Sequence, residues 1–140
     1  MLINLPYQLH RDEDGTLDLR PICTVVLLGR TTRVPFQVLI DSGATHPFFP
    51  ASAAKDAGLD LTRAQPVLCR FVGPGAIGYL LKGVFIEIKR HRLRIDVIFL
   101  DDQLLSQFGM PLLGRRGVFA AFNEVSFTEK TDPMRVELRS

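Results

Sequence analysis

The sequence predicts an all-β protein whose strands form a closed, barrel-like sheet with one or two short helices. Short apolar runs, many of them alternating apolar and polar residues, follow one another along the chain and are separated by Gly, Pro and Asp turn signals. Helix-forming stretches are few and brief, so the strand–helix–strand rhythm of a parallel α/β sheet is missing. These features favour antiparallel strands that close around one core.

The composition is that of an ordinary globular domain. The chain has 140 residues, of which 46% are apolar and 23% charged, and it shows no repeat or linker, so we expect residues 1–140 to form a single domain. A net charge of +2 is too small to argue for nucleic acid, and no apolar run approaches the ~20 residues that cross a membrane. Residues 1–20 carry an acidic patch in place of the basic and then apolar pattern of a signal peptide, so a cytoplasmic location is expected.

The two cysteines, Cys23 and Cys69, each lie within an apolar stretch. We expect them to be reduced core residues and not a disulfide, because isolated cysteines in apolar surroundings behave as small buried hydrophobes. Neither is accompanied by the paired histidines or cysteines of a zinc site, so no metal is expected.

The first clear element is a hairpin. Ile22–Leu28 has the β-branched, apolar composition of a strand, residues 29–31 provide a turn, and Arg33–Ile40 forms the returning strand. Asp41 follows directly at the end of the second strand of this hairpin. Before it, residues 1–20 form a mixed segment with a short apolar start, for which we expect an arm or an edge strand.

The middle of the chain predicts a short helix and a second hairpin. Residues 51–58 contain helix-forming alanines that end at Gly58, a residue suited to a helix C-terminus. Residues 67–71 predict a strand, and residues 72–78 then hold three glycines and one proline, which no regular element tolerates. Because the flanks are apolar, this segment is either the tip of a hairpin that covers a site or a surface loop without a ligand.

Two alternating runs, residues 84–88 and 93–100, predict half-buried antiparallel strands. The basic residues 89–92 fall at the turn between them, where they indicate a solvated hairpin tip and not a nucleic-acid patch. The remaining expected elements are a helical or irregular piece up to Phe108, one or two helical turns over residues 118–122, and late strands over residues 123–127 and 134–138.

Asp41 is notable because the apolar residues 38–40 stop abruptly on it. An ionised carboxylate beside buried side chains loses hydration, and Ser42 and Gly43 can hold it at a tight turn through a hydroxyl and free N–H groups. Two such carboxylates that face each other share one proton and can act as base and acid on water and a carbonyl. Asp-Ser-Gly is also ordinary turn chemistry, so these residues alone leave both interpretations open.

Three features in this order resemble the retropepsin-like aspartic proteases, the half-length, single-motif family that includes retroviral proteases and cellular relatives. They are the apolar strand that leads into residues 41–45, the Gly-rich segment within residues 71–79, and the apolar pair followed by glycine and arginine at residues 112–115, before a short helix. The resemblance covers roughly residues 22–127. It implies a retropepsin-like closed β-barrel with a flap hairpin, and the activity of an aspartic endopeptidase.

The resemblance also implies roles for individual residues. Asp41 would be the catalytic aspartate, and Ser42 would brace the two active loops across a dimer. Gly43 would let the substrate backbone approach closely, and Ala44 would line the cleft. Thr45 occupies the position where retroviral members usually have an Asp that pairs with the helix arginine. The other implied residues are Phe71, Val72, Gly73, Pro74, Gly75 and Ile77 in the flap and substrate cleft, and Leu112, Leu113, Gly114 and Arg115 as a structural brace behind the loop.

Because the chain carries a single such motif, a catalytic dyad requires two chains, which implies a homodimer. Water held between the two carboxylates would attack the peptide carbonyl, with no metal and no organic cofactor. The polypeptide substrate would lie extended in the cleft under both flaps. The apolar flap residues Phe71, Val72 and Ile77 indicate a preference for apolar side chains.

His46 and Ser42 are the other candidate catalytic side chains near Asp41. His46 lies five residues after Asp41, but a carboxylate dyad already supplies acid and base, so we expect a rim or subsite residue. Ser42 lacks the Gly-x-Ser-x-Gly surroundings of a serine nucleophile. A catalytically silent module of the same fold, retained for dimerisation or peptide binding, is the alternative function, and the intact Asp-Ser-Gly triplet favours the enzyme.

Overall fold

The computed structural model describes residues 1–70, 75–107, 109–130 and 133–140. Its strands are β1 Leu2–Pro6, β2 Gln8–Arg11, β3 Leu17–Arg20, β4 Ile22–Leu28, β5 Arg33–Ile40, β6 Phe48–Pro50, β7 Gln65–Cys69, β8 Ala76–Ile88, β9 His91–Leu100, β10 Leu112–Leu113, β11 Glu124–Thr128 and β12 Arg135–Arg139. Its helices are α1 Ala51–Asp56 and α2 Asp102–Ser106, with single 3-10 turns η1 Leu61–Arg63 and η2 Phe119–Ala121. The predicted all-β class with short helices is confirmed.

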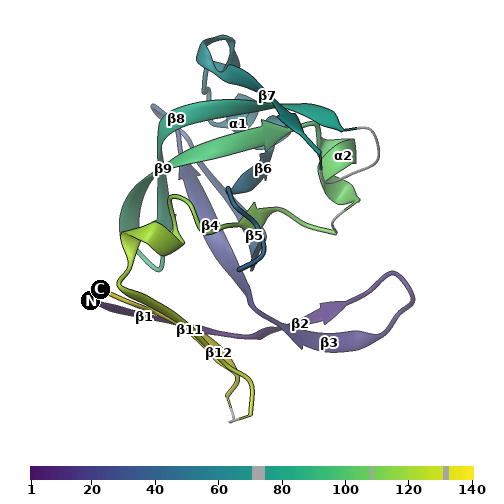
Figure 1. Cartoon of the computed structure of the whole chain (residues 1–140), viewed down its shortest axis with the longest axis vertical. Coiled ribbons are helices and arrows are strands. Elements are labelled where there is room, and N and C mark those ends of the chain that lie inside the picture. The colour runs from purple at the N-terminus through teal and green to yellow at the C-terminus, as the bar shows by residue number, and fades with distance from the viewer. Residues whose placement is uncertain (71–74, 108, 131–132) are drawn as a thin grey trace.

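The main sheet closes into a barrel, as predicted (Figure 1). Its strands are hydrogen-bonded in the order β4-β5-β10-β6-β9-β8-β7, and β4 also pairs with β8. This extra pairing joins residues 26–28 to residues 85–87 and completes the ring. The other half of β8, residues 76–80, pairs with β7 outside the ring, so β8 belongs both to the barrel and to a hairpin that extends from it.

The barrel is filled by the alternate side chains of its strands. Val25 and Leu27 of β4 are fully buried, whereas Val26 between them is only partly so, as expected for a strand with one face on the core. Phe49 of β6 has no exposed surface and lies between two other rings. Its ring centroid is 4.9 Å from that of Phe36 and 6.2 Å from that of Phe99, both edge to face.

Strand β8 is longer than the sequence pattern indicated. Residues 79–81 and 84–88 were expected to be separate pieces, but they form one strand of 13 residues. The register with β9 shifts between Leu81 and Val84, which places a bulge at Lys82 and Gly83. Gly83 has φ +69°, a conformation that few residues other than glycine adopt, and it makes the bulge possible.

A second, three-stranded sheet joins the two ends of the chain in the order β1-β12-β11. The termini lie side by side at one end of it (Figure 1), where the Ser140 N–H donates to the Met1 carbonyl at 2.9 Å. The edge strand expected within residues 1–20 is therefore present as β1. The hairpin of β2 and β3 that follows was not predicted, and it projects away from the barrel in Figure 1.

The helices are short, as their sequences indicated. Helix α1 begins directly after Pro50, and Gly58 follows its C-terminus with φ +71°, donating its N–H to the Lys55 carbonyl. The expected helical turns at residues 118–122 are a single 3-10 turn, Phe119–Ala121. Phe48–Pro50 forms β6, which no sequence pattern predicted.

Both cysteines are free and buried, as predicted. Burial raises the pKa of the Cys23 thiol to about 12 and also raises that of Cys69, so both side chains behave as apolar core residues at neutral pH. Among the residues that the structure describes, no helix is long and apolar enough to span a membrane.

Candidate active site

The loop that carries Asp41 is shaped by the strands on either side of it. Strand β10 runs parallel to β5 and antiparallel to β6, so it lies between them in the sheet. The connection from β5 to β6, residues 41–47, must therefore cross the end of β10. At the crossing point stands Gly114, where an added Cβ would lie 2.6 Å from the His46 carbonyl oxygen and 2.8 Å from that of Ala44. Only glycine leaves room for this crossing.

Asp41 is fixed through both its backbone and its side chain. Its N–H donates to the Leu113 carbonyl at 2.9 Å, which continues the β5–β10 pairing by one residue. Carboxylate oxygen Oδ1 accepts the Gly43 N–H at 2.8 Å, and the Asp41 carbonyl accepts the Ala44 N–H at 3.2 Å. The result is a tight Asx turn that holds the carboxylate at the strand end. The second carboxylate oxygen accepts no hydrogen bond from any residue that the structure describes.

The rest of the loop is anchored by residues that follow β10. The Arg115 N–H donates to the Ala44 carbonyl at 2.9 Å, and the Arg116 N–H donates to the Thr45 carbonyl at 2.8 Å. The contact between the loop and Arg115, the arginine of the predicted brace, is therefore made by backbone atoms of both. Among the described residues, no ion pair involves the Arg115 side chain. Ser42 and Gly43 are exposed, so the polar edge of the loop is accessible.

The underside of the loop is apolar. Ala44 is buried in a cluster that is separate from the main barrel core, and the predicted brace residues Leu112 and Leu113 are buried as well. The cluster consists of Ala44, Phe48, Cys69, Ile98, Leu100, Leu105 and Leu112, with Leu39, Val67 and Leu80 packed against it. The cluster contains residues of the active loop and of the β7–β8 hairpin, so the positions of the loop and of the hairpin depend on the same packing.

The Gly-rich segment joins β7 and β8, which pair antiparallel from Gln65 opposite Leu80 to Cys69 opposite Ala76. The hairpin expected from the apolar flanks is therefore present. Of the predicted flap residues, Phe71, Val72, Gly73 and Pro74 lie outside the described residues. Gly75 has φ +103° just before β8, and Ile77 on β8 is 50% exposed.

Asp41 lines a hollow of about 410 Å³ that no sequence pattern predicted. Ser42 also lines it, with Leu39 and Ile40 of β5 and four residues from outside the main sheet: Tyr7 and Pro21 before β4, and Phe127 and Glu129 in and just after β11. Tyr7 donates its hydroxyl hydrogen to Glu129 at 3.2 Å. No motif marked Tyr7, Phe127 or Glu129, because they lie beside the pairing of the two ends of the chain.

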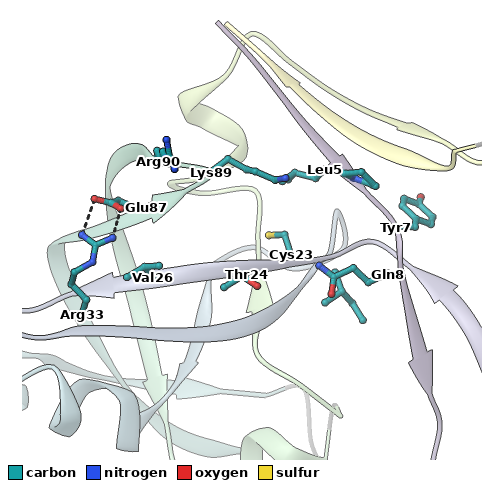
Figure 2. A pocket seen from close by; sticks show the side chains of 12 residues that line it. Leu5, Tyr7, Gln8, Cys23, Thr24, Val26, Arg33, Glu87, Lys89 and Arg90 are labelled. Atoms are coloured by element: carbon teal, nitrogen blue, oxygen red, sulfur yellow. Dashed lines mark hydrogen bonds and ion pairs between the residues drawn. The ribbon is translucent and has the colours of Figure 1, made fainter.

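A larger hollow, of about 500 Å³, lies between the β1–β2 segment, β4 and the β8–β9 turn (Figure 2). Its floor is apolar and includes Cys23, and its rim carries Lys89 and Arg90. Arg33 and Glu87 close one side with a two-pronged ion pair at 3.2 and 2.7 Å. None of the loop residues 41–46 lines this hollow. Although it is larger than the hollow at Asp41, it is therefore not part of the candidate active site.

Two comparisons relate the chain to known proteins. The family model of retroviral aspartyl proteases matches residues 22–124. The crystal structure of a retropepsin-like aspartic protease from Rickettsia conorii superposes with a TM-score of 0.59 at 17% sequence identity, and the match covers 99% of this chain and 89% of that one. A comparison with curated proteins finds no match. The matched range contains the Asp41 loop, the β7–β8 hairpin and β10.

Proposed function

Because this chain belongs to the retroviral aspartyl protease family, we propose that it is a homodimeric aspartic endopeptidase. The observation that carries the proposal is the fixed carboxylate of Asp41, held by the Gly43 N–H at a strand end and open to a hollow of about 410 Å³. A carboxylate held in this way is suited to bind and activate water. The retropepsin-like fold supports the same reaction class.

The chain supplies one half of the chemistry. A single Asp-Ser-Gly loop occurs in the sequence, and a dyad needs two carboxylates in hydrogen-bonding reach. In the proposed dimer the two Asp41 side chains meet on a two-fold axis. Exposed Ser42 braces the two loops, and Gly43, which has no side chain, lets the substrate backbone approach.

The reaction follows from the shared proton. One Asp41 carboxylate takes a proton from a bound water as the water oxygen attacks the peptide carbonyl. The protonated carboxyl of the other chain donates its proton to the carbonyl oxygen, so that a neutral tetrahedral intermediate forms. The first carboxyl then donates its new proton to the leaving nitrogen while the second carboxylate takes a proton from a hydroxyl of the intermediate, so that the C–N bond breaks and the products are a carboxylic acid and an amine. No other group is needed to balance these steps.

The substrate in this proposal is an extended polypeptide. The β7–β8 hairpin covers it from above, where backbone hydrogen bonds supply affinity and alternate side chains enter pockets. Exposed Ile77 on β8 agrees with the apolar preference inferred from the flap sequence.

Incubation of the purified chain with an unfolded protein between acidic and neutral pH tests the proposal. We expect peptide products whose formation is blocked by a peptide that carries a secondary alcohol in place of the scissile carbonyl, because the alcohol mimics the tetrahedral intermediate. Mass spectrometry of the products identifies the cleaved bonds. A dimeric protein that cleaves nothing at any pH, yet binds the unfolded protein, would instead favour a silent peptide-binding module.

A further inference from the structure

A second hollow next to the active loop is lined by an excess of positive charge. It measures about 390 Å³, and its lining includes three basic side chains but only one carboxylate. The full lining is His46, Gln65, Leu80, Lys82, Arg94, Ile95, Asp96, Arg116 and Gly117. Three cations that converge on one hollow repel each other, so this arrangement favours an anion between them.

The bulge in β8 holds one of these cations in place. An added Cβ at Gly83 would lie 2.8 Å from Nη2 and 2.9 Å from Nε of Arg94, so the guanidinium packs directly on the glycine backbone. The Arg94 guanidinium also lies over the Phe85 ring, with Cζ 5.9 Å from its centroid. A guanidinium that already contacts a backbone and a ring loses less freedom when it binds a carboxylate.

The single carboxylate of the hollow offsets at most one of the three positive charges. Asp96 accepts the Gly83 N–H through Oδ1 at 3.0 Å, so it stabilises the bulge. None of the ion pairs among the described residues involves Lys82, Arg94 or Arg116. The three cations therefore retain their capacity to bind an external anion.

The imidazole of His46, which also lines the hollow, responds to the charge inside it. Partial burial is the main cause that lowers the pKa of His46, and the positive charge of Arg116 lowers it further, against an opposing effect of Asp96. At neutral pH the imidazole is therefore uncharged, and an anion that bound here would raise its pKa again. His46 consequently reports on occupancy of the hollow.

The position of the hollow ties it to the proposed cleft. His46 is at the far end of the loop that begins with Asp41, and Gln65 and Leu80 form the pair at the open end of the β7–β8 hairpin. The hollow therefore lies along the path of an extended peptide that follows this loop from Asp41 under the hairpin.

We propose that this hollow is an outer subsite that binds an acidic side chain of the substrate, a glutamate or aspartate located two or more residues from the cleaved bond. The inference rests on the proposed function. It adds a charged determinant to the apolar preference expected near the scissile bond, so good substrates combine an apolar centre with an acidic flank.

Two decapeptides test the subsite. Both contain the same Phe-Phe centre, and their outer positions are all glutamate in one and all glutamine in the other. We expect kcat/KM to be about tenfold higher for the glutamate peptide, the size expected of one charge-assisted contact at a partly exposed site. The triple variant Lys82→Gln/Arg94→Gln/Arg116→Gln should cleave both peptides equally, whereas Arg30→Gln, which removes an exposed cation at the β4–β5 turn, should retain the preference.

A binding measurement separates failure of the subsite from failure of the proposed enzyme. In Asp41→Asn protein, NMR titration with the same peptides should give a lower dissociation constant for the glutamate peptide, with shifts at Gly83 and a raised pKa of His46. Equal kcat/KM values, equal dissociation constants, or a preference that survives in the triple variant would overturn the inference. If neither peptide is cleaved but the glutamate peptide binds preferentially at Gly83, the subsite stands and the endopeptidase proposal fails.

Discussion

Replacement of Asp41 with Asn is expected to abolish peptide cleavage and leave the fold intact. The Asn side chain has the shape of Asp and can still accept the Gly43 N–H, so the turn at the end of β5 is preserved. What is lost is the group that removes a proton from water. Removal of a general base costs about 10²- to 10⁴-fold, and both positions of the dyad are changed at once in the dimer, so we expect kcat to fall at least about 1,000-fold.

The measurement is the rate of product formation from an unfolded protein by wild type, Asp41→Asn and Asp41→Ala. Asp56→Asn is the matched control, because Asp56 is an exposed carboxylate at the end of α1. Circular dichroism and the melting temperature should be close to those of wild type for Asp41→Asn. Undiminished cleavage by both Asp41 variants would remove this residue from the mechanism.

Replacement of Gly114 with Ala is expected to be the most disruptive single-methyl change at the site. The new Cβ would lie 2.6 Å from the His46 carbonyl oxygen and 2.8 Å from that of Ala44, well inside contact distance. Both are backbone atoms of the loop that crosses β10, so a rotamer change cannot relieve the overlap. The loop must shift, and with it the Asp41 carboxylate. Overpacking of this kind costs about 1–3 kcal/mol of stability, and a 1 Å displacement costs about 100-fold in rate.

Thermal unfolding and cleavage rate should be measured on the same Gly114→Ala preparation. Gly15→Ala is a suitable control, since Gly15 has φ +86° but nothing within 4 Å of its added Cβ. That variant adds the backbone strain of a side chain at positive φ, about 1–2 kcal/mol, without any overlap, and should keep full activity. If Gly114→Ala retained both wild-type stability and wild-type activity, the loop crossing would not be the constraint that we describe.

Sequence patterns predicted the parts of the fold that depend on local signals. The hairpin of β4 and β5 was predicted with its observed bounds, because β4 is an apolar run rich in β-branched residues, β5 ends in the apolar residues 38–40, and a glycine marks the turn. Asp41 at the end of β5 was identified for the same reason. The barrel class was also correct, since alternation in β9 requires a sheet with one buried face.

Other features depend on contacts between distant segments, and no local pattern encodes them. Strand β10 has only two residues, and it is defined by its pairing with β5 on one side and β6 on the other. The β8 bulge joins two runs that look separate in the sequence. Tyr7 reaches the Asp41 hollow because β1 pairs with β12 across the whole length of the chain. The basic hollow was missed because Lys82, Arg94 and Arg116 come from three different elements.

The central claim is that each active site needs one Asp41 from each of two chains, and subunit mixing tests it most directly. Wild-type protein is allowed to exchange subunits with increasing amounts of Asp41→Asn, and cleavage is measured per wild-type chain. If two carboxylates from different chains form one site, activity per wild-type chain falls in proportion to the wild-type fraction, to about half in an equal mixture. Activity per wild-type chain that stays constant at every ratio, with exchange verified by native mass spectrometry, would contradict the shared site.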